Sequence, residues 1–428
     1  MAMLLLVVVV SLVVFFINNN GGSGDDRGHI LPCDTVEVKT SRPVVRIYME
    51  NSGSMNGYVT TNSQFKNALG HLITKADGFY ADTQVNFINQ GIYHTPMCDD
   101  LDNFVLNLNP SSMQVGNTSS TDINKIFKMI LDRTSRDTVS VLVSDCMYDV
   151  ENVDNQLAAA ANSTTGTFMK AIRRAHDAKE EFAVIIMQCT SQFSGNYYEG
   201  NTAIPCNGER PYYVIVMGNL RQVMDFNNHM ELQNTSTGLP GMTHKYMLSS
   251  ESTWTLDNTT ARTFTRDFTN ARKIQPEEDR LNIRKITTNH DQVNLKLGVA
   301  LGVSNLFADR TYLIDKNNYK VEPSTVSIAD IGEQVSFPDY DVFEKPFSLQ
   351  LVTEGQSFVP QVTITLLNQI PGWVKTCSYT KRSGALPPSH QSYALYEMVE
   401  GIYGAFYNSM TGKSKDLFRL QFRIGGYE

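Results

Sequence analysis

Between residues 43 and 224 the sequence alternates short apolar runs with stretches of helical period, and this alternation restricts the fold more than any other feature of the chain. Val139–Val143 is made almost wholly of Val and Leu, which is typical of a strand covered by helices on both faces. Gln64–Lys75 and Asp122–Leu131 carry apolar residues at helical spacing. Strands that alternate with helices predict an α/β fold with a doubly wound, mostly parallel sheet. The other elements expected here are strands at Val44–Met49, Val85–Ile92, Phe104–Leu106, Phe182–Met187 and Tyr212–Met217 and a helix at Thr167–Lys179.

Residues 225–428 follow a different pattern, and a chain of 428 residues is long enough for two domains. Short alternating runs are separated by turns rich in Asn, Asp, Gly and Pro, which predicts a mainly antiparallel β domain, built as a sandwich. The runs are Thr253–Leu256, Tyr312–Ile314, Phe347–Val352 and Val359–Leu366; they are followed by an amphipathic helix at Tyr393–Tyr407 and a last strand at Leu417–Ile424.

The amino terminus, residues 1–24, is a hydrophobic segment followed by a linker. Met3–Ile17 has Ser11 as its only polar side chain, and its length lies between that of a signal-peptide core and that of a membrane-spanning helix. The Asn/Gly/Ser-rich stretch that follows it is typical of a flexible linker. We expect a signal or anchor, and therefore a membrane-anchored or exported protein. No Lys or Arg precedes the segment, so a buried core element and a cytoplasmic location stay open as alternatives.

Charge and cysteine content exclude several classes of partner and site. The formal net charge is -8, with 36 basic against 44 acidic residues, so a nucleic acid is not expected as the partner. The six cysteines include no CxxC pair, which argues against a structural zinc site. In an exported protein we expect Cys189 and Cys206, which flank one loop, to be the first candidates for a disulfide. Cys146 directly follows a strand end and is expected to be a buried free thiol.

Polar side chains follow two predicted strands and open one predicted helix. Glu50, Ser52 and Ser54 come directly after the strand at Val44–Met49, Thr121 precedes the helix that begins at Asp122, and Asp145 closes the strand at Val139–Val143. The carboxyl ends of parallel strands meet at one edge of a sheet, so these side chains are expected to converge. Hydroxyl and carboxylate oxygens suit Mg²⁺ or Mn²⁺ better than zinc. A lone Ser-Gly-Ser is more often a turn or a helix cap, and the prediction depends on all three fragments together.

At these residues the chain resembles the von Willebrand factor A (integrin I-like) family, which has a Rossmann-like α/β fold. The resemblance covers residues 43–220 and lies in the order of the Ser-x-Ser, Thr and Asp residues and in their placement at strand ends. It implies a metal-ion-dependent adhesion site in which Ser52 and Ser54 ligate the metal, Thr121 ligates it directly or through water, and Glu50 and Asp145 hold metal-bound waters. Thr118 competes with Thr121 for the threonine position.

One departure from the family pattern leaves the function open. The first residue of the family's motif is Asp, and here it is Glu50, which is one methylene longer and either reaches a metal-bound water or fills the site. With no evident nucleophile or general base beside the site, we expect a protein that binds the acidic residue of a protein partner, as in adhesion, rather than an enzyme. A scaffold subunit with a degenerate metal site and a Mg²⁺-dependent hydrolase are the alternatives.

Overall fold

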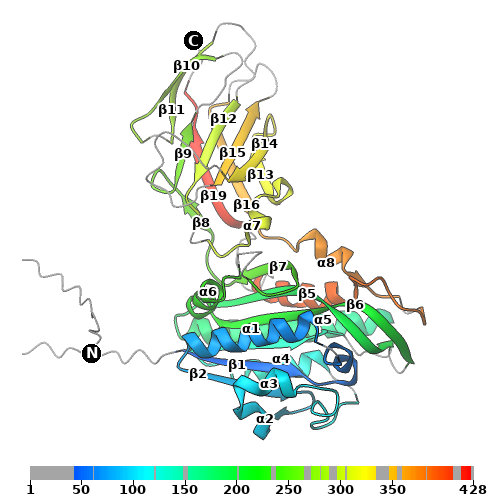
Figure 1. Cartoon of the computed structure of the whole chain (residues 1–428). Coiled ribbons are helices and arrows are strands. Elements are labelled where there is room, and N and C mark those ends of the chain that lie inside the picture. The colour runs from blue at the N-terminus through cyan, green and yellow to red at the C-terminus, as the bar shows by residue number, and fades with distance from the viewer. Residues whose placement is uncertain are drawn as a thin grey trace, which may run out of the picture. The chain divides into compact units, whose positions relative to one another are not determined.

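A seven-stranded sheet, in the order β3-β2-β1-β4-β6-β5-β7, is the central element of this computed structural model (Figure 1). Its strands are β1 (Val44–Glu50), β2 (Asp82–Ile88), β3 (Ile92–Tyr93), β4 (Thr138–Ser144), β5 (Phe182–Glu199), β6 (Thr202–Asn219) and β7 (Met242–Ser249). The structure describes residues 43–60, 62–119, 122–147, 153–199, 202–232, 238–264, 271–279, 281–288, 296–303, 306–333, 347–353, 359–381, 383–407 and 416–425.

The sheet combines parallel and antiparallel pairing. β1 pairs in parallel with β2 on one side and with β4 on the other. β5 and β6 are the legs of one long hairpin, which must be antiparallel because only two residues join them. The hairpin adds to β4 through β6 and to β7 through β5, again antiparallel. The expected α/β fold is confirmed. The expected parallel pairing is found in the β2–β1–β4 part of the sheet, whereas the pairings that involve β3, β5, β6 and β7 are antiparallel.

Helices cover both faces of this sheet, as the two buried clusters of apolar side chains show. Alternate residues of a strand point to opposite faces, so Ile47 and Tyr48 of β1 belong to different clusters. The Ile47 face is covered by α1 (Gln64–Phe79), α3 (Leu101–Asn107) and α6 (Leu220–His229). The Tyr48 face is covered by α4 (Ile123–Leu131), α5 (Val153–Asp177) and α9 (Leu395–Tyr407).

Two four-stranded sheets share a third apolar core, so the sandwich expected for the second half of the chain is present. Pairing within both sheets is antiparallel except between β8 and β19. One sheet contains β14 (Val326–Glu333), β15 (Phe347–Thr353), β12 (Lys296–Leu301) and β9 (Ala261–Phe264). The other contains β13 (Tyr319–Glu322), β16 (Gln361–Leu367), β19 (Asp416–Arg423) and β8 (Trp254–Leu256).

The expected boundary at residues 224/225 does not separate these two cores. β7 lies after that boundary and is an edge strand of the seven-stranded sheet. α9 lies later still, and its buried side chains pack in the Tyr48 cluster. The short elements α8 (Gly372–Thr376), β17 (Ser378–Tyr379) and β18 (Ser392–Tyr393) contribute to the same cluster. The sandwich is therefore an insertion between β7 and α8, and one of its strands, β19, comes from the end of the chain.

Two runs expected to be strands are helices. Phe104–Leu106 lies in α3, which begins where the Asp100 side chain accepts a hydrogen bond from the amide of Asn103. Tyr312–Ile314 begins in α7 (Arg310–Leu313) and is capped in the same way by Asp309. In both cases an acidic N-cap decides the local structure of a run too short to show helical period.

The cysteine and membrane predictions have different outcomes. A disulfide between Cys189 and Cys206 is wrong: both are free thiols, because the hairpin register places Cys189 opposite Tyr212 and Cys206 opposite Gly195. Cys146 is confirmed as a buried free thiol. No helix in the described part of the chain is long and apolar enough to cross a membrane. Residues 1–24 lie outside the described residues.

Candidate functional site

The Ser-Gly-Ser segment forms a tight turn directly after β1. A 3₁₀ helix, η1 (Gly53–Tyr58), begins there, with Ser52 in extended conformation at its N-cap. The hydroxyl oxygens of Ser52 and Ser54 lie 2.9 Å apart and hydrogen-bond each other. The amide of Gly53 donates to the carbonyl of Thr118 at 3.0 Å, so this turn and the 113–119 loop are in contact. The turn therefore presents two adjacent hydroxyls at the carboxyl end of β1.

Asp145 lies beside this turn because β1 and β4 are parallel neighbours, with Met49 opposite Val143. Its side chain is 5% exposed and accepts a hydrogen bond from the Met147 amide at 3.3 Å. Burial raises the pKa of the Asp145 carboxyl, and the nearby Ser54 hydroxyl, the Met147 amide and the positive charge of Arg210 act in the opposite direction. The structure thus brings Ser52, Ser54 and a buried, incompletely compensated carboxylate together at one rim.

Glu50 is held toward β4. Its carboxylate accepts a hydrogen bond from the Ser144 hydroxyl, and that same hydroxyl oxygen accepts from the amide of Cys146 at 2.8 Å. Glu50 is 4% exposed, so its carboxyl group is buried. Cys146 has a φ of 53°, a left-handed conformation that is uncommon for a residue with a side chain and that turns the chain sharply after β4. Burial raises the pKa of the Cys146 thiol well above its usual value, so it stays protonated.

The two threonine candidates differ in how much the structure says about them. Thr121 lies outside the described residues, and its contribution stays a prediction. Thr118 lies in the loop that touches the Ser-Gly-Ser turn, but its hydroxyl donates to the side-chain oxygen of Gln114 at 3.4 Å. The backbone carbonyl of Thr118, rather than its side chain, is therefore the group that contacts the turn.

Two buried asparagines, which the sequence reasoning missed, position this loop. Asn51 is 1% exposed and donates to the carbonyls of Met113 at 2.8 Å and Val115 at 2.7 Å. Asn89, which follows β2, donates to Asn51 and to the same Val115 carbonyl. Each asparagine is the first residue after a strand, β1 or β2, and this position is the signal in the sequence that could have identified it. Together they fix the 113–119 loop against the ends of β1 and β2.

Arg210 is a second residue that was missed. It is 3% exposed, and its guanidinium donates to the carbonyls of Pro387, Pro388 and Gln391 at 2.8 to 3.2 Å. It also lies 4.5 Å above the ring of Tyr197, a cation–π distance. The charge of Arg210 is felt at Asp145, so a permanent cation already lies close to the rim. An arginine directly before an apolar strand run was the only signal in the sequence.

A two-stranded arm stands over the rim. It consists of residues 190–199 and 202–212, the part of the β5–β6 hairpin beyond its pairing with β4 and β7, and Figure 1 shows it running past the other strands. β6 pairs with β4 as far as Ser144, so the arm starts where β4 ends and Asp145 begins.

The arm is fastened to η1 and to the start of α1. The Tyr58 hydroxyl donates to the carbonyl of Pro211 at 2.6 Å, and the Thr60 hydroxyl donates to that of Ser194 at 3.2 Å. Gly57 packs against Phe193 so closely that an added Cβ would lie 2.3 Å from the ring. The arm is thus a fixed wall of the site.

The donors at the rim fit a hard divalent cation in part. Two hydroxyls and a buried carboxylate are oxygen ligands of the kind that Mg²⁺ and Mn²⁺ prefer, and the carboxylate lacks full compensation for its burial. Within the described ranges there is no group of three His, Cys, Asp or Glu residues that could hold a metal, so any cation here would rely on serine hydroxyls and water. The hydrogen bond from Ser144 to Glu50 fits a cation site least well, because it already engages the carboxylate that is expected to hold metal-bound water.

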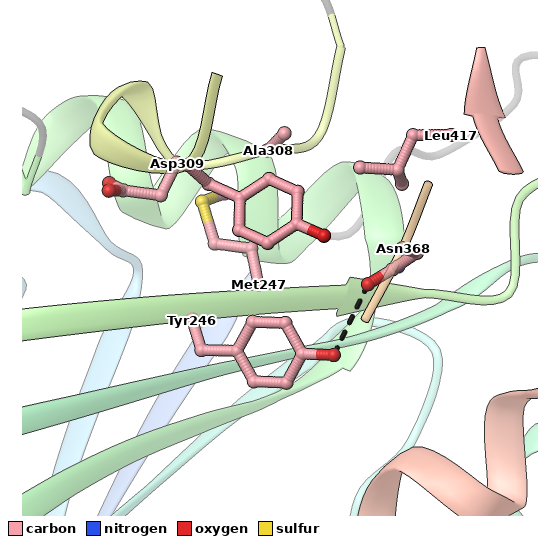
Figure 2. A pocket seen from close by; sticks show the side chains of 7 residues that line it. Tyr246, Met247, Ala308, Asp309, Asn368 and Leu417 are labelled. Carbon is pink, nitrogen blue, oxygen red and sulfur yellow. Dashed lines mark hydrogen bonds between the residues drawn. The ribbon is translucent and has the colours of Figure 1, made fainter. Parts of the chain in front are cut away.

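A small cavity lies elsewhere, between β7 and the segments that carry α7 and Asn368 (Figure 2). Tyr246 donates to the Asn368 side chain at 3.2 Å, and Asn368 donates to the Tyr407 hydroxyl at 2.6 Å. β7 is separated from β4 by two strands, which places it about 14 Å across the sheet from the rim at a spacing of about 4.8 Å. The other polar side chains of the lining also have partners in the protein, since Tyr312 donates to the Leu367 carbonyl and Asp309 pairs with Lys245. We therefore interpret the cavity as a packing gap between structural elements.

Comparisons with known proteins add little to this geometry. No family model and no curated protein matches the chain. Among solved structures, the chain is similar to the crystal structure of an aerotolerance-related membrane protein from Bacteroides fragilis NCTC 9343 with multiple mutations to serines, at 19% identity and a TM-score of 0.19. The match covers 29% of this chain and 63% of that chain, so it spans less than two thirds of that protein's length. With so low a TM-score, the match carries no argument about fold or function.

Proposed function

We propose that the chain binds a protein partner through a divalent cation, Mg²⁺ or Mn²⁺, held at the rim by Ser52, Ser54 and Asp145. The observation that carries the proposal is the convergence of the two hydroxyls, 2.9 Å apart, with a buried carboxylate whose pKa is raised by burial. A dication beside Asp145 would compensate the desolvated charge. Thr121 would complete the ligand set, and Glu50 would hold bound water when it is released from Ser144.

Binding is a better account of this rim than catalysis. In the part of the chain that the structure describes, the groups beside the rim offer no activated nucleophile. Burial keeps the Cys146 thiol protonated, and the Glu50 carboxylate is engaged by Ser144. When bound, the cation would supply one strongly electrophilic coordination position, which suits an incoming carboxylate from an Asp or Glu of the partner. The hydrophobic segment at residues 1–24 would place this module at a membrane or outside it.

A direct test measures the cation itself. The 428-residue chain is purified with residues 1–24 present, in detergent that keeps this hydrophobic segment in solution. It is titrated with Mn²⁺, and binding is followed by electron paramagnetic resonance. We expect one Mn²⁺ to bind, Mg²⁺ to compete with it, and Ser54→Ala to weaken binding at least tenfold. The matched control is Ser327→Ala, because Ser327 is exposed on β14 and remote from the rim. Wild-type protein that binds no Mn²⁺ would refute the proposal.

A metal-free scaffold is the second candidate, and two contacts favour it. Ser144 already binds Glu50, and Arg210 already places a positive charge near Asp145, so the rim has internal partners for both carboxylates. In that case the partner contacts would lie on other surfaces. Elemental analysis of protein purified without chelator distinguishes the two, since stoichiometric Mg²⁺ or Mn²⁺ contradicts the scaffold.

A further inference from the structure

Tyr198, near the tip of the arm, lies against the Ser-Gly-Ser turn. A Cβ built on Gly53 would lie 3.7 Å from both the ring edge and the hydroxyl oxygen of Tyr198. Gly53 is the residue between the two serines, so the phenol lies against the backbone of the turn that carries their hydroxyls. Other arm residues of the same strand, such as Ser194 and Asn196, are exposed, whereas Tyr198 is half-buried. The turn and the arm therefore meet through this side chain.

The Tyr198 hydroxyl has no hydrogen-bond partner within the described part of the chain. This distinguishes it from the neighbouring tyrosine hydroxyls, because that of Tyr58 donates to Pro211 and that of Tyr197 pairs with Tyr379. A phenol offers one O–H donor, and a donor that is half-buried and unused gains most from an acceptor that arrives with a ligand.

The position of Tyr198 is set by structure that does not depend on a ligand. Its chain neighbour Tyr197 is 4% exposed and is fixed by Tyr379 and by the guanidinium of Arg210. Further along the arm, Phe193 packs on Gly57 of η1. A side chain held in place before binding loses little conformational entropy when it contacts a ligand, which is why rigid tyrosines are frequent among residues that dominate binding.

We infer that Tyr198 is a specificity-determining residue whose hydroxyl donates a hydrogen bond to the carboxylate that docks at the Ser52–Ser54 rim. The inference rests on the proposed function, because it assumes that a carboxylate docks there. The ligand class is an aspartate or glutamate side chain on a projecting segment of a protein, since the arm closes one side of the rim and a flat surface would meet the arm first.

The test uses Mn²⁺ and a simple carboxylate, N-acetyl-aspartate amide, on the full-length chain in detergent. Mn²⁺ affinity is measured first, and the probe is then titrated into the Mn²⁺-loaded protein by calorimetry. Tyr198→Phe removes only the hydroxyl and keeps the contact with Gly53. We expect Mn²⁺ affinity to stay within about twofold of wild type and probe affinity to fall about tenfold, the scale of one hydrogen bond to a charged acceptor. The control is Tyr396→Phe, because the Tyr396 hydroxyl donates to Glu400 within α9 and not to the rim.

Each other outcome overturns a distinct claim. If Mn²⁺ and the probe both bind wild type and Tyr198→Phe equally, the role of Tyr198 is refuted and the cation site stands. If Tyr198→Ala weakens the probe while Tyr198→Phe does not, the ring packs and the hydroxyl is not used, which also refutes the inference. If wild type binds no Mn²⁺, the proposed function fails and the inference fails with it. Thermal melting of each variant shows that the comparison is made on folded protein.

Discussion

The hydroxyl of Ser54 lies beside the carboxylate of Asp145 and lowers its pKa, so the turn after β1 and the end of β4 meet at this pair. Parallel pairing of the two strands brings these residues together, although 90 residues separate them in the chain. The Ser54 hydroxyl favours the ionised carboxylate but does not outweigh its burial, because the pKa of Asp145 is still raised. Ionising Asp145 therefore costs more free energy in the folded protein than in the unfolded chain.

Asp145→Asn should stabilise the metal-free protein at neutral pH. The folded pKa of Asp145 lies above its unfolded value near 3.8, so above the unfolded pKa the folded state holds on to a proton more strongly than the unfolded state does. The free energy of unfolding then falls as the pH rises from about 3.8 through the folded pKa. An Asn side chain has no charge to bury and keeps an oxygen beside Ser54, so we expect its free energy of unfolding to exceed that of wild type at pH 7. Urea unfolding in EDTA at a series of pH values measures it.

The same substitution separates stability from binding. Asp145→Asn should lose Mn²⁺ affinity while it gains stability, since the carboxylate that destabilises the empty rim is the one that would attract the cation. A matched control is Asp82→Asn, because Asp82 is exposed at the start of β2 and should change neither quantity. Loss of stability in Asp145→Asn with EDTA present would show that burial of this charge is compensated.

Gly57→Ala should detach the arm from the rim. An alanine Cβ would lie 2.3 Å from the Phe193 ring, so either the ring or the strand must move. Overpacking of this kind costs about 1–3 kcal/mol. The matched control is Gly78→Ala in α1, where an added Cβ meets nothing within 4 Å and helix propensity favours Ala by up to about 1 kcal/mol. Unfolding in urea gives the free energy of unfolding of both variants, and the rate of protease cleavage within 190–212 reports on the attachment of the arm. Equal stability of the two variants would contradict the close packing of Gly57 on Phe193.

The sequence predicts the elements that have strong patterns. β1, β4, α1 and α4 begin and end within a few residues of the expected positions, because each is an apolar run or a periodic helix whose burial decides its structure. Phe104–Leu106 resembles a strand in sequence because three consecutive apolar residues show no helical period, whereas the Asp100 N-cap makes the segment a helix. The position of β7 in the sheet depends on pairing between residues 183–189 and 242–249, which no local pattern records.

The candidate site divides in the same way. The convergence of Ser52, Ser54 and Asp145 can be predicted because each follows a strand end, and the ends of a parallel pair share one edge. Their role as metal ligands stays a prediction. Arg210 and Tyr198 were missed because they reach the rim through the arm, whose length becomes visible only when the register of β5 and β6 is known. The arm is an extension of a hairpin, and no short sequence motif predicts how far such an extension runs.

Arg210→Lys should weaken the attachment of the 387–391 segment without removing the positive charge. The guanidinium donates three hydrogen bonds to backbone carbonyls of that segment and stacks over Tyr197, whereas an ammonium group cannot reproduce the planar arrangement. With about 1 kcal/mol for each lost hydrogen bond, we expect a loss of roughly 2–3 kcal/mol in the free energy of unfolding. Arg221→Lys is the control, because Arg221 is exposed on α6 and should change stability by less than about 0.5 kcal/mol. Mn²⁺ affinity should stay the same in both variants, since the charge near Asp145 is kept. An unchanged unfolding curve for Arg210→Lys would mean that the three carbonyls are as well satisfied by water, and the role assigned to the guanidinium would be wrong.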